Sequence, residues 1–358
     1  MQRAKRAKAH LAAIATAFSA VLAVALMCTL PPLMSSPAAQ EVRYHRIGTG
    51  STAGTYFPIG GIIASAISKP PGSRDCELGG SCGVPGLIAV AQSTAGSVAN
   101  VMGIAEGTLE SGLSQADISY WAYNGKGAFA KTGPIEKLRA VANLFPEAVH
   151  VVVRRNAGVF SLADLRGKRV SLDREGSGTR VDALLIFEAF GLGPGDIEAE
   201  ALSAGDAADS LRAGEIDAFV MVVGTPATAI LGLAEDSLIT LLPIAGPEAQ
   251  ALRDKYPFFH EDRIEAGTYF NVPATETLSV GAQWLVSADL PEELVYGLTR
   301  ALWHDNTRRL LDNGHPKGKA IQKASALNGL VVPLHPGARR YYENAETPFP
   351  GLTLDKSD

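Results

Sequence analysis

The chain has 358 residues, 46% of them hydrophobic and 19% charged, and a formal net charge of −5 at pH 7. This length accommodates two domains with apolar cores, at about 100 to 200 residues per domain. The net negative charge argues against a nucleic-acid-binding protein. It does not argue against binding of a small anion, because local hydrogen-bond donors determine whether such a ligand binds.

Residues 1–39 have the order of a secretory signal peptide. Four basic residues before position 9 precede an apolar run over 11–30, and the small residues Ser36, Ala38 and Ala39 follow. We expect cleavage after Ala38 or Ala39, which leaves 28 basic and 37 acidic residues and a net charge of −9. An uncleaved anchor is the alternative, because the apolar run is long enough to span a bilayer.

Two Gly/Ser/Thr loops are the most informative feature of the chain. GTGSTAGTY, residues 48–56, follows a predicted strand over 42–47, and EGSGTR, residues 175–180, follows a predicted strand over 170–172. Each loop precedes a predicted helix, and the free N–H groups and positive dipole end of a helix N-terminus attract carboxylate or phosphate. Because more than a hundred residues separate the loops, we expect two lobes that close on one ligand.

Cys76 and Cys82 enclose a short Gly-containing loop, CELGGSC. Because export favours oxidation, we predict a disulfide between them. The alternatives are two free thiols or half of a metal site, although no second cysteine pair is present and the histidines lack metal-ligand spacing.

Apolar runs alternate with helical patterns along the rest of the chain, which is typical of an α/β protein. The strands that we predict lie at 87–91, 116–121, 149–153, 170–172, 218–223 and 278–286. The helices lie at 96–110, 161–167, 179–190, 206–213 and 291–313, and an extended edge segment follows at 330–338.

Enzyme classes find weak support in the motifs. Residues 48–54 match a loose dinucleotide-binding pattern, but the following segment does not end in a strand with an acidic ribose ligand, so an exported NAD-type oxidoreductase is a minor alternative. Ser177 lies outside any Gly-x-Ser-x-Gly elbow and has no nearby histidine in the sequence, which argues against serine hydrolysis.

Between residues 44 and 342 the chain resembles the TAXI family of solute-binding proteins of TRAP transporters. The runs that carry the resemblance are IGTGSTAGTYFPIGG, QSTAGSVANVMGIAEG, QADISYWAY, DLRGKRVSLDREGSGTR, LRAGEIDAFVMVVGTP and PLHPGARRYY. The resemblance implies an α/β, two-lobe periplasmic binding protein fold, type II-like, with the ligand cleft between the lobes. We expect lobe 1 to comprise 40–147 and the return segment 277–358, and lobe 2 to comprise 148–276.

The resemblance also implies a periplasmic, monomeric receptor without catalytic residues or cofactor. It would bind a small carboxylate, such as glutamate, glutamine or a 2-oxoglutarate-like acid, and deliver it to an ion-gradient-driven TRAP permease. An ABC-type type II binding protein is the alternative.

Matching motifs place ligand-binding residues in both lobes. In lobe 1 they are Thr52, Tyr56, Ser97, Asn100 and Tyr123. In lobe 2 they are Ser177, Gly178, Thr179 and Gly224. The role of Arg180 stays open, because a residue just past a helix cap can point to solvent.

Overall fold

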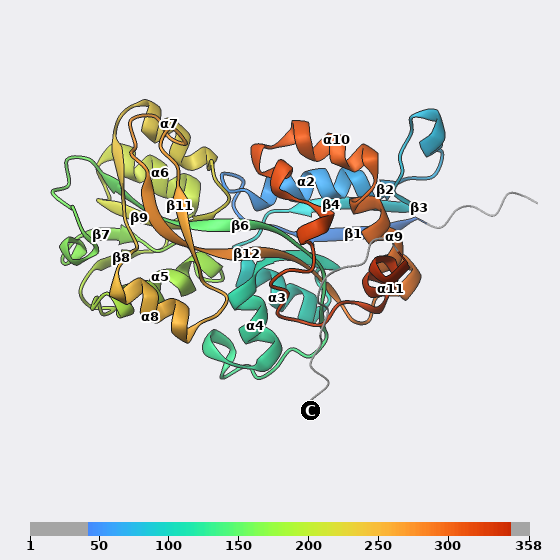
Figure 1. The fold of residues 1–358 in the computed structure, drawn as a ribbon, viewed down its shortest axis with the longest axis horizontal. Helices are drawn as coiled ribbons and strands as arrows, with labels where there is room; N and C mark the ends of the chain where they lie inside the picture. The colour runs from blue at the N-terminus through green and yellow to red at the C-terminus, as the bar shows by residue number, and fades with distance from the viewer. Residues whose placement is uncertain (1–41, 345–358) are drawn as a thin grey trace, which may run out of the picture. The chain divides into compact units, whose positions relative to one another are not determined.

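The computed structural model describes residues 42–344 (Figure 1). The signal peptide predicted for 1–39 lies outside these residues. The strands are β1 Arg43–Gly48, β2 Ser68–Lys69, β3 Val84–Pro85, β4 Leu87–Gln92, β5 Ser111–Gln115, β6 Leu138–Arg154, β7 Arg169–Ser171, β8 Glu198–Glu200, β9 Ala218–Val223, β10 Ile239–Leu242, β11 His260–Ile264 and β12 Thr275–Ser287. The α-helices are α2 Tyr56–Ile67, α3 Ser97–Glu106, α4 Ala116–Asn124, α5 Gly178–Ala189, α6 Ala204–Ala213, α7 Thr228–Glu235, α8 Pro247–Lys255, α9 Glu292–Leu302, α10 Asp305–Gly314 and α11 Pro336–Asn344.

Five 3₁₀ turns connect these elements within the described residues: Cys76–Leu78, Gly127–Phe129, Leu162–Leu165, Pro316–Ala320 and Lys323–Ser325. Within the same range we find no helix whose length and hydrophobicity would suit a membrane span.

The fold is mixed α/β, with a sheet in the order β4-β1-β5-β12-β6-β9-β7-β8. Strand β10 adds to β6, and β11 adds to β12. Parallel pairs form within each end of the sheet, β1 with β4 and β5, and β7 with β8 and β9. Strands β6 and β12 run antiparallel through the middle, between the helices α2 and α3 of lobe 1 and the helices α5 and α6 of lobe 2 (Figure 1).

Strand β6 passes from one lobe to the other. Its first part pairs with β12, and from Ala148 to Val153 it pairs with β9. The lobe boundary predicted between 147 and 148 coincides with this change of partner, and the boundaries themselves stay a prediction.

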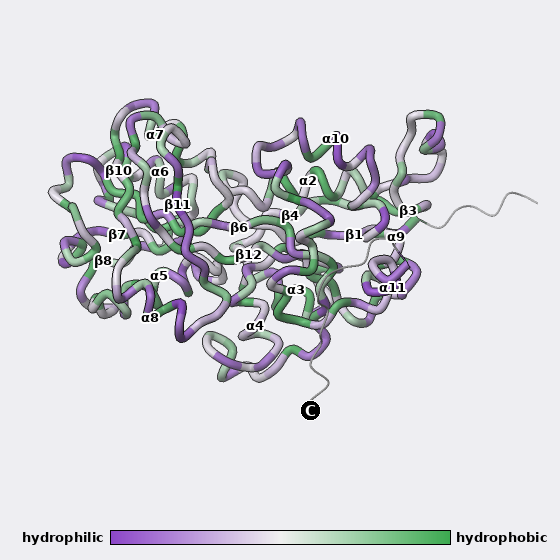
Figure 2. Tube along the Cα trace, viewed as in Figure 1, coloured by the Kyte–Doolittle hydropathy of each residue, from purple (hydrophilic) through white to green (hydrophobic). Residues whose placement is uncertain are grey.

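The core follows from the composition of the central strands. Every residue of β9, AFVMVV, is buried, as expected for an inner strand covered on both faces. Trp284 on β12 and Phe145 on β6 are among the largest fully buried side chains. Figure 2 shows hydrophobic stretches along α2, α3 and the central strands, and the apolar faces of these elements therefore meet in the interior.

The prediction of a strand at 116–121 is wrong. The strand in this part of the chain is β5, which ends at Gln115, and α4 begins at Ala116. The buried residues Ile118, Trp121 and Ala122 recur at helical spacing, whereas short apolar runs fit strands and helices alike.

Two other segments are interrupted. The helix predicted over 291–313 is α9 followed by α10, because His304 restarts the helix: its Nδ1 accepts a hydrogen bond from the Asn306 N–H at 3.1 Å. The segment predicted to be extended over 330–338 pairs only at Leu334, with Ala140, and α11 begins at Pro336. Proline fits the first turn of a helix, where its missing N–H has no partner to lose.

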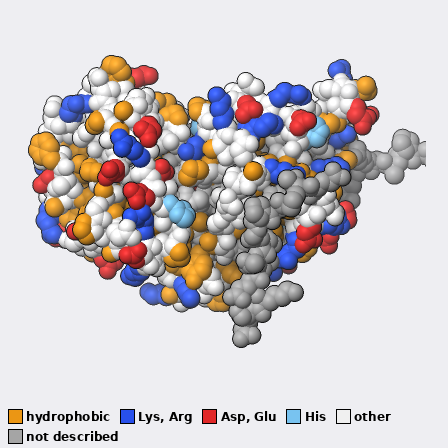
Figure 3. Space-filling model, in the orientation of Figure 1, with side chains coloured by type: hydrophobic (Ala, Val, Ile, Leu, Met, Phe, Trp, Pro, Cys, Tyr) orange, Lys and Arg blue, Asp and Glu red, His pale blue; other side chains and the backbone are white. Residues whose placement is uncertain are grey.

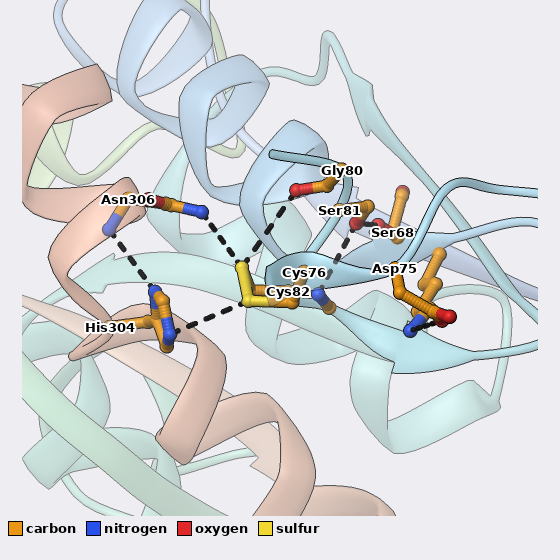
Figure 4. Close-up of polar contacts among 10 residues, drawn as sticks. Ser68, Asp75, Cys76, Gly80, Ser81, Cys82, His304 and Asn306 are labelled. Atoms are coloured by element: carbon orange, nitrogen blue, oxygen red, sulfur yellow. Dashed lines mark hydrogen bonds and ion pairs between the residues drawn. A yellow bond between two sulfur atoms is a disulfide. The ribbon is translucent and has the colours of Figure 1, made fainter. Parts of the chain in front are cut away.

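The predicted disulfide between Cys76 and Cys82 is confirmed. Figure 4 shows it packed against the start of α10, where the Asn306 Nδ2 donates to the Cys82 Sγ at 2.8 Å. The His304 Nε2 lies 3.6 Å from the Cys76 Sγ. The disulfide loop is therefore attached to lobe 1 through α10.

We expect replacement of both cysteines by serine to lower the free energy of unfolding by about 2 kcal/mol, because closing a loop with a sequence separation of 6 restricts the unfolded chain little. Urea unfolding under oxidising conditions measures this. The single variant Cys82→Ser should lower the free energy of unfolding by the same amount as the double variant, because either change removes the disulfide. A loss of twice this size would contradict the entropic origin and assign the stability to packing on α10.

Candidate functional site

A cavity of about 50 Å³ lies between the two lobes. Its wall comes from the loops that precede α2, α3 and α5, from the end of β9, and from Gln115 and Glu147. At about 10 to 15 Å³ per water-sized group, this space holds roughly three to five such groups.

Helix N-termini from both lobes converge on this cavity. Tyr56 begins α2, Ser97 begins α3 and Gly178 begins α5, and all three line the cavity. Because the first N–H groups of a helix have no partner within it, each N-terminus carries a partial positive charge. The convergence creates an anion-binding environment that both lobes build together.

Ser177 is the N-cap of α5, and the helix begins at Gly178, one residue before the predicted start at 179. Its Oγ accepts a hydrogen bond from the Arg180 N–H at 3.1 Å. Within the described residues, the N–H groups of Gly178 and Thr179 have no acceptor. These two groups are therefore the donors that α5 can offer to a ligand.

Hydrogen bonds around the cavity join the two lobes. The Ala99 N–H donates to the Gly176 carbonyl at 2.9 Å, and the Arg174 Nη2 donates to the Thr94 carbonyl at 2.9 Å. On the other side, the Thr55 Oγ1 donates to the carbonyl of Gly224 at 2.9 Å. The structure is therefore a closed arrangement of the lobes.

Gly178 is the closest point of approach. A Cβ at this position would lie 1.3 Å from the Gln115 Oε1, which belongs to the other lobe. Any larger residue there would force the Gln115 side chain out of its position while the lobes are closed.

Glu147 is a buried acid on the crossing strand β6, 2% exposed, and it lines the cavity. The Tyr56 hydroxyl donates to its Oε2 at 2.5 Å. Burial raises the pKa of Glu147 to about 8, although the Tyr56 hydrogen bond and the charge of Lys317 act in the opposite direction. Glu147 is therefore mostly protonated at neutral pH and adds little negative charge to the cavity.

Two further buried carboxyl groups face each other near the cavity. Asp117 in α4 and Asp182 in α5 are fully buried and come from opposite lobes. Burial is the main cause that raises the pKa of both groups, and each faces the other. The Gln115 Nε2 donates to the Asp182 Oδ2 at 2.8 Å, which holds the Gln115 side chain at the cavity.

Five of the residues expected to bind ligand line the cavity: Tyr56, Ser97, Ser177, Gly178 and Thr179. The Thr179 hydroxyl already accepts from the Val222 N–H at 3.1 Å, so its side chain also anchors α5 to β9.

The other four lie elsewhere. Thr52 is exposed and does not line the cavity. Asn100 is fully buried and donates to the carbonyls of Thr49 and Leu113 at 2.6 and 2.7 Å. Tyr123 packs against the apolar core. Gly224 does not line the cavity, but its carbonyl accepts a hydrogen bond from Thr55, which does.

Sequence reasoning missed Gln115, Glu147 and Asp173, which also line the cavity. Glu147 gave a usable signal, because a single acid interrupts the largely apolar run 144–153, and buried acids are rare. Gln115 and Asp173 gave none, because neither differs in sequence from an ordinary polar residue at the end of a strand.

Residues 47–345 match the NMT1-like family. Among solved structures, a protein from Bordetella bronchiseptica RB50 shares 15% identity at a TM-score of 0.50, covering 83% of this chain and 82% of that one. MatC from Rhodopseudomonas palustris with bound malate shares 15% identity at a TM-score of 0.48, covering 76% and 89%. The alkanesulfonate-binding protein SsuA from Xanthomonas axonopodis pv. citri bound to MOPS shares 16% identity at a TM-score of 0.43, covering 78% and 82%.

We expect the variant Glu147→Gln to be more stable than the wild type at pH 9 and about equally stable at pH 5. The pKa of Glu147 rises from 4.5 to about 8 on folding, so its contribution to stability is full below pH 4.5 and is lost as the pH approaches 8. The slope of the loss is at most about 1.4 kcal/mol per pH unit.

Urea unfolding between pH 5 and 9 measures the difference. Glu276→Gln on β12 is the matched control, because Glu276 is exposed. A difference between Glu147→Gln and wild type that did not change with pH would contradict a proton held on Glu147.

Proposed function

The chain belongs to the NMT1-like family, and we propose that it is an exported solute receptor that binds a small carboxylate between its two lobes. The observation that carries this proposal is the convergence of the N-termini of α2, α3 and α5 on one closed cavity. An anion between the lobes interacts with helix N-termini from both of them, and this interaction favours closure around it.

The polar groups of the cavity support a carboxylate rather than a dianion such as phosphate. The free N–H groups of Gly178 and Thr179 can donate to two oxygens of one carboxylate. Glu147, held protonated, can donate to a neighbouring oxygen of the solute, or accept from an ammonium group when it ionises. Asp173 also lines the cavity, and burial raises its pKa to about 6. Above that pH the Asp173 carboxylate would repel a second negative charge on the solute.

Binding rather than catalysis is the function that this geometry supports best. The Ser177 hydroxyl caps α5, and among the described residues no histidine lines the cavity to activate it. The volume of the closed cavity is small, so we propose that the lobes separate to admit a solute and close around its carboxylate.

We further propose that the receptor works with a TRAP permease, as its resemblance to TAXI proteins implies, in the periplasm. Its ligand-contacting residues would be Tyr56, Ser97, Ser177, Gly178 and Thr179, while Thr52, Asn100, Tyr123 and Gly224 would shape the loops around them. An ABC-type partner is the alternative. A neighbouring gene for a large multi-span permease without an ATPase gene would favour the TRAP partner.

The thermal unfolding temperature of the mature protein should rise in the presence of a subset of amino acids, 2-oxo acids and dicarboxylates, and it should stay unchanged with neutral sugars. A ligand at 100 times its dissociation constant adds about 2.7 kcal/mol to the free energy of unfolding. Stabilisation by sugars, with none by any carboxylate, would overturn the proposed ligand class.

Gly178→Ala should weaken the binding of the carboxylate found in that screen by at least about tenfold, because the new Cβ would overlap the Gln115 side chain only when the lobes close. The fold should persist, since alanine suits the first turn of a helix. Calorimetric titration measures the affinity.

Gly61→Ala in α2 is the matched control, because a Cβ there meets nothing within 4 Å. Equal affinity of the Gly178→Ala and Gly61→Ala variants would show that the ligand binds without this closure.

A further inference from the structure

A second, larger cavity of about 720 Å³ lies on the other side of the crossing strands. Its wall comes from α4, from residues 255–258 at the end of α8, from β6 and β12, and from residues 328–331. Pro146 faces it, whereas the next residue, Glu147, faces the first cavity, because successive side chains of a strand point to opposite faces. Hydrophobic side chains gather between α8 and α4 on the face shown in Figure 3.

Aromatic rings from both lobes form the floor of this cavity. Tyr256 and Phe258 stack with centroids 5.6 Å apart and an interplanar angle of 19°. Trp121 of α4 meets both edge-on, with centroids 5.9 and 5.2 Å away. Trp121 and Phe258 are buried in this packing, so the cluster gives the cavity a rigid apolar wall. The cavity has the size of pockets that enclose organic ligands, about 300 to 1,000 Å³.

The charged groups at this cavity are all basic. Lys126 lies over the Tyr120 ring at 5.8 Å from its centroid, and Lys255 lies over the Tyr256 ring at 5.0 Å. His260 also lines the wall, and no Asp or Glu lines it among the described residues. In a chain of net charge −5, a wall with only basic groups is complementary to an anion.

We propose that this cavity is a second ligand site, for an organic anion with a flat aromatic body. The body would lie against Trp121, Tyr256 and Phe258, and the anionic group would lie between Lys126 and Lys255 at the rim. The size and the aromatic wall distinguish it from the first cavity, whose polar groups are hydroxyls, N–H groups and carboxyls. The inference does not depend on which solute the first cavity takes.

A ligand in this cavity would act on the lobes as well. Trp121 belongs to α4 in lobe 1, whereas Tyr256 and Phe258 follow α8 in lobe 2. An occupant in contact with both would favour the arrangement of lobes described here, and its affinity would therefore be coupled to that of the first ligand.

Anilinonaphthalene sulfonate, a fluorescent aromatic anion, is the probe for the test. We expect saturable binding of one probe per folded chain, with fluorescence measured well below the unfolding temperature. Lys126→Glu combined with Lys255→Glu should weaken binding at least about tenfold, because both exposed cations become repulsive. Neutral anilinonaphthalene, without the sulfonate, should bind more weakly to the wild type.

Lys131→Glu combined with Lys319→Glu is the matched control, because it changes the net charge equally at exposed positions outside the cavity wall. Equal probe affinity of the two double variants would overturn the proposal. The carboxylate found in the thermal screen should not displace the probe, and competition between the two would place the probe in the first cavity instead. Failure of the first cavity to bind carboxylates would leave the expected probe results unchanged.

Discussion

The pairing of β6 with β12 is the constraint on which the rest of the structure depends. These strands pair from Leu138 to Ala148 and then separate, as β6 continues beside β9. Because both lobes share these strands, the lobes can move only by twisting or bending them, and the N-termini of α2, α3 and α5 keep their directions toward one cavity. The alternation of side chains on β6 also decides which groups face which cavity.

Buried carboxyl groups near the first cavity avoid adding negative charge to it by keeping their protons. The helix N-termini supply partial positive charge, and the buried acids nearby, Glu147, Asp117 and Asp182, have raised pKa values because burial penalises their charged forms. If these acids were ionised, they would cancel the attraction of the N-termini for an anion. The low polarity that raises their pKa values therefore also preserves the anion-binding character of the cavity.

Local patterns predicted most of the fold, and contacts distant in sequence decided the rest. The strand at 218–223 and the disulfide loop at 76–82 follow from residues close together in the chain. The helix at 116–124 does not, because its apolar run is too short to distinguish a helix from a strand. For the candidate site, the loops 48–56 and 175–180 were found through their composition, whereas Gln115 reaches the cavity only because β5 places it opposite Gly178.

The edges of the first cavity are formed by glycines, and this limits where selectivity for a solute can arise. Gly96 approaches Ser177, and Gly176 approaches Ala95, so the lobes meet through backbone and small side chains. Backbone N–H groups recognise a carboxylate but not the remainder of a solute. Selectivity must therefore come from the side chains that line the cavity, Glu147 above all, because its protonation state decides whether it donates to an oxygen or accepts from an ammonium group.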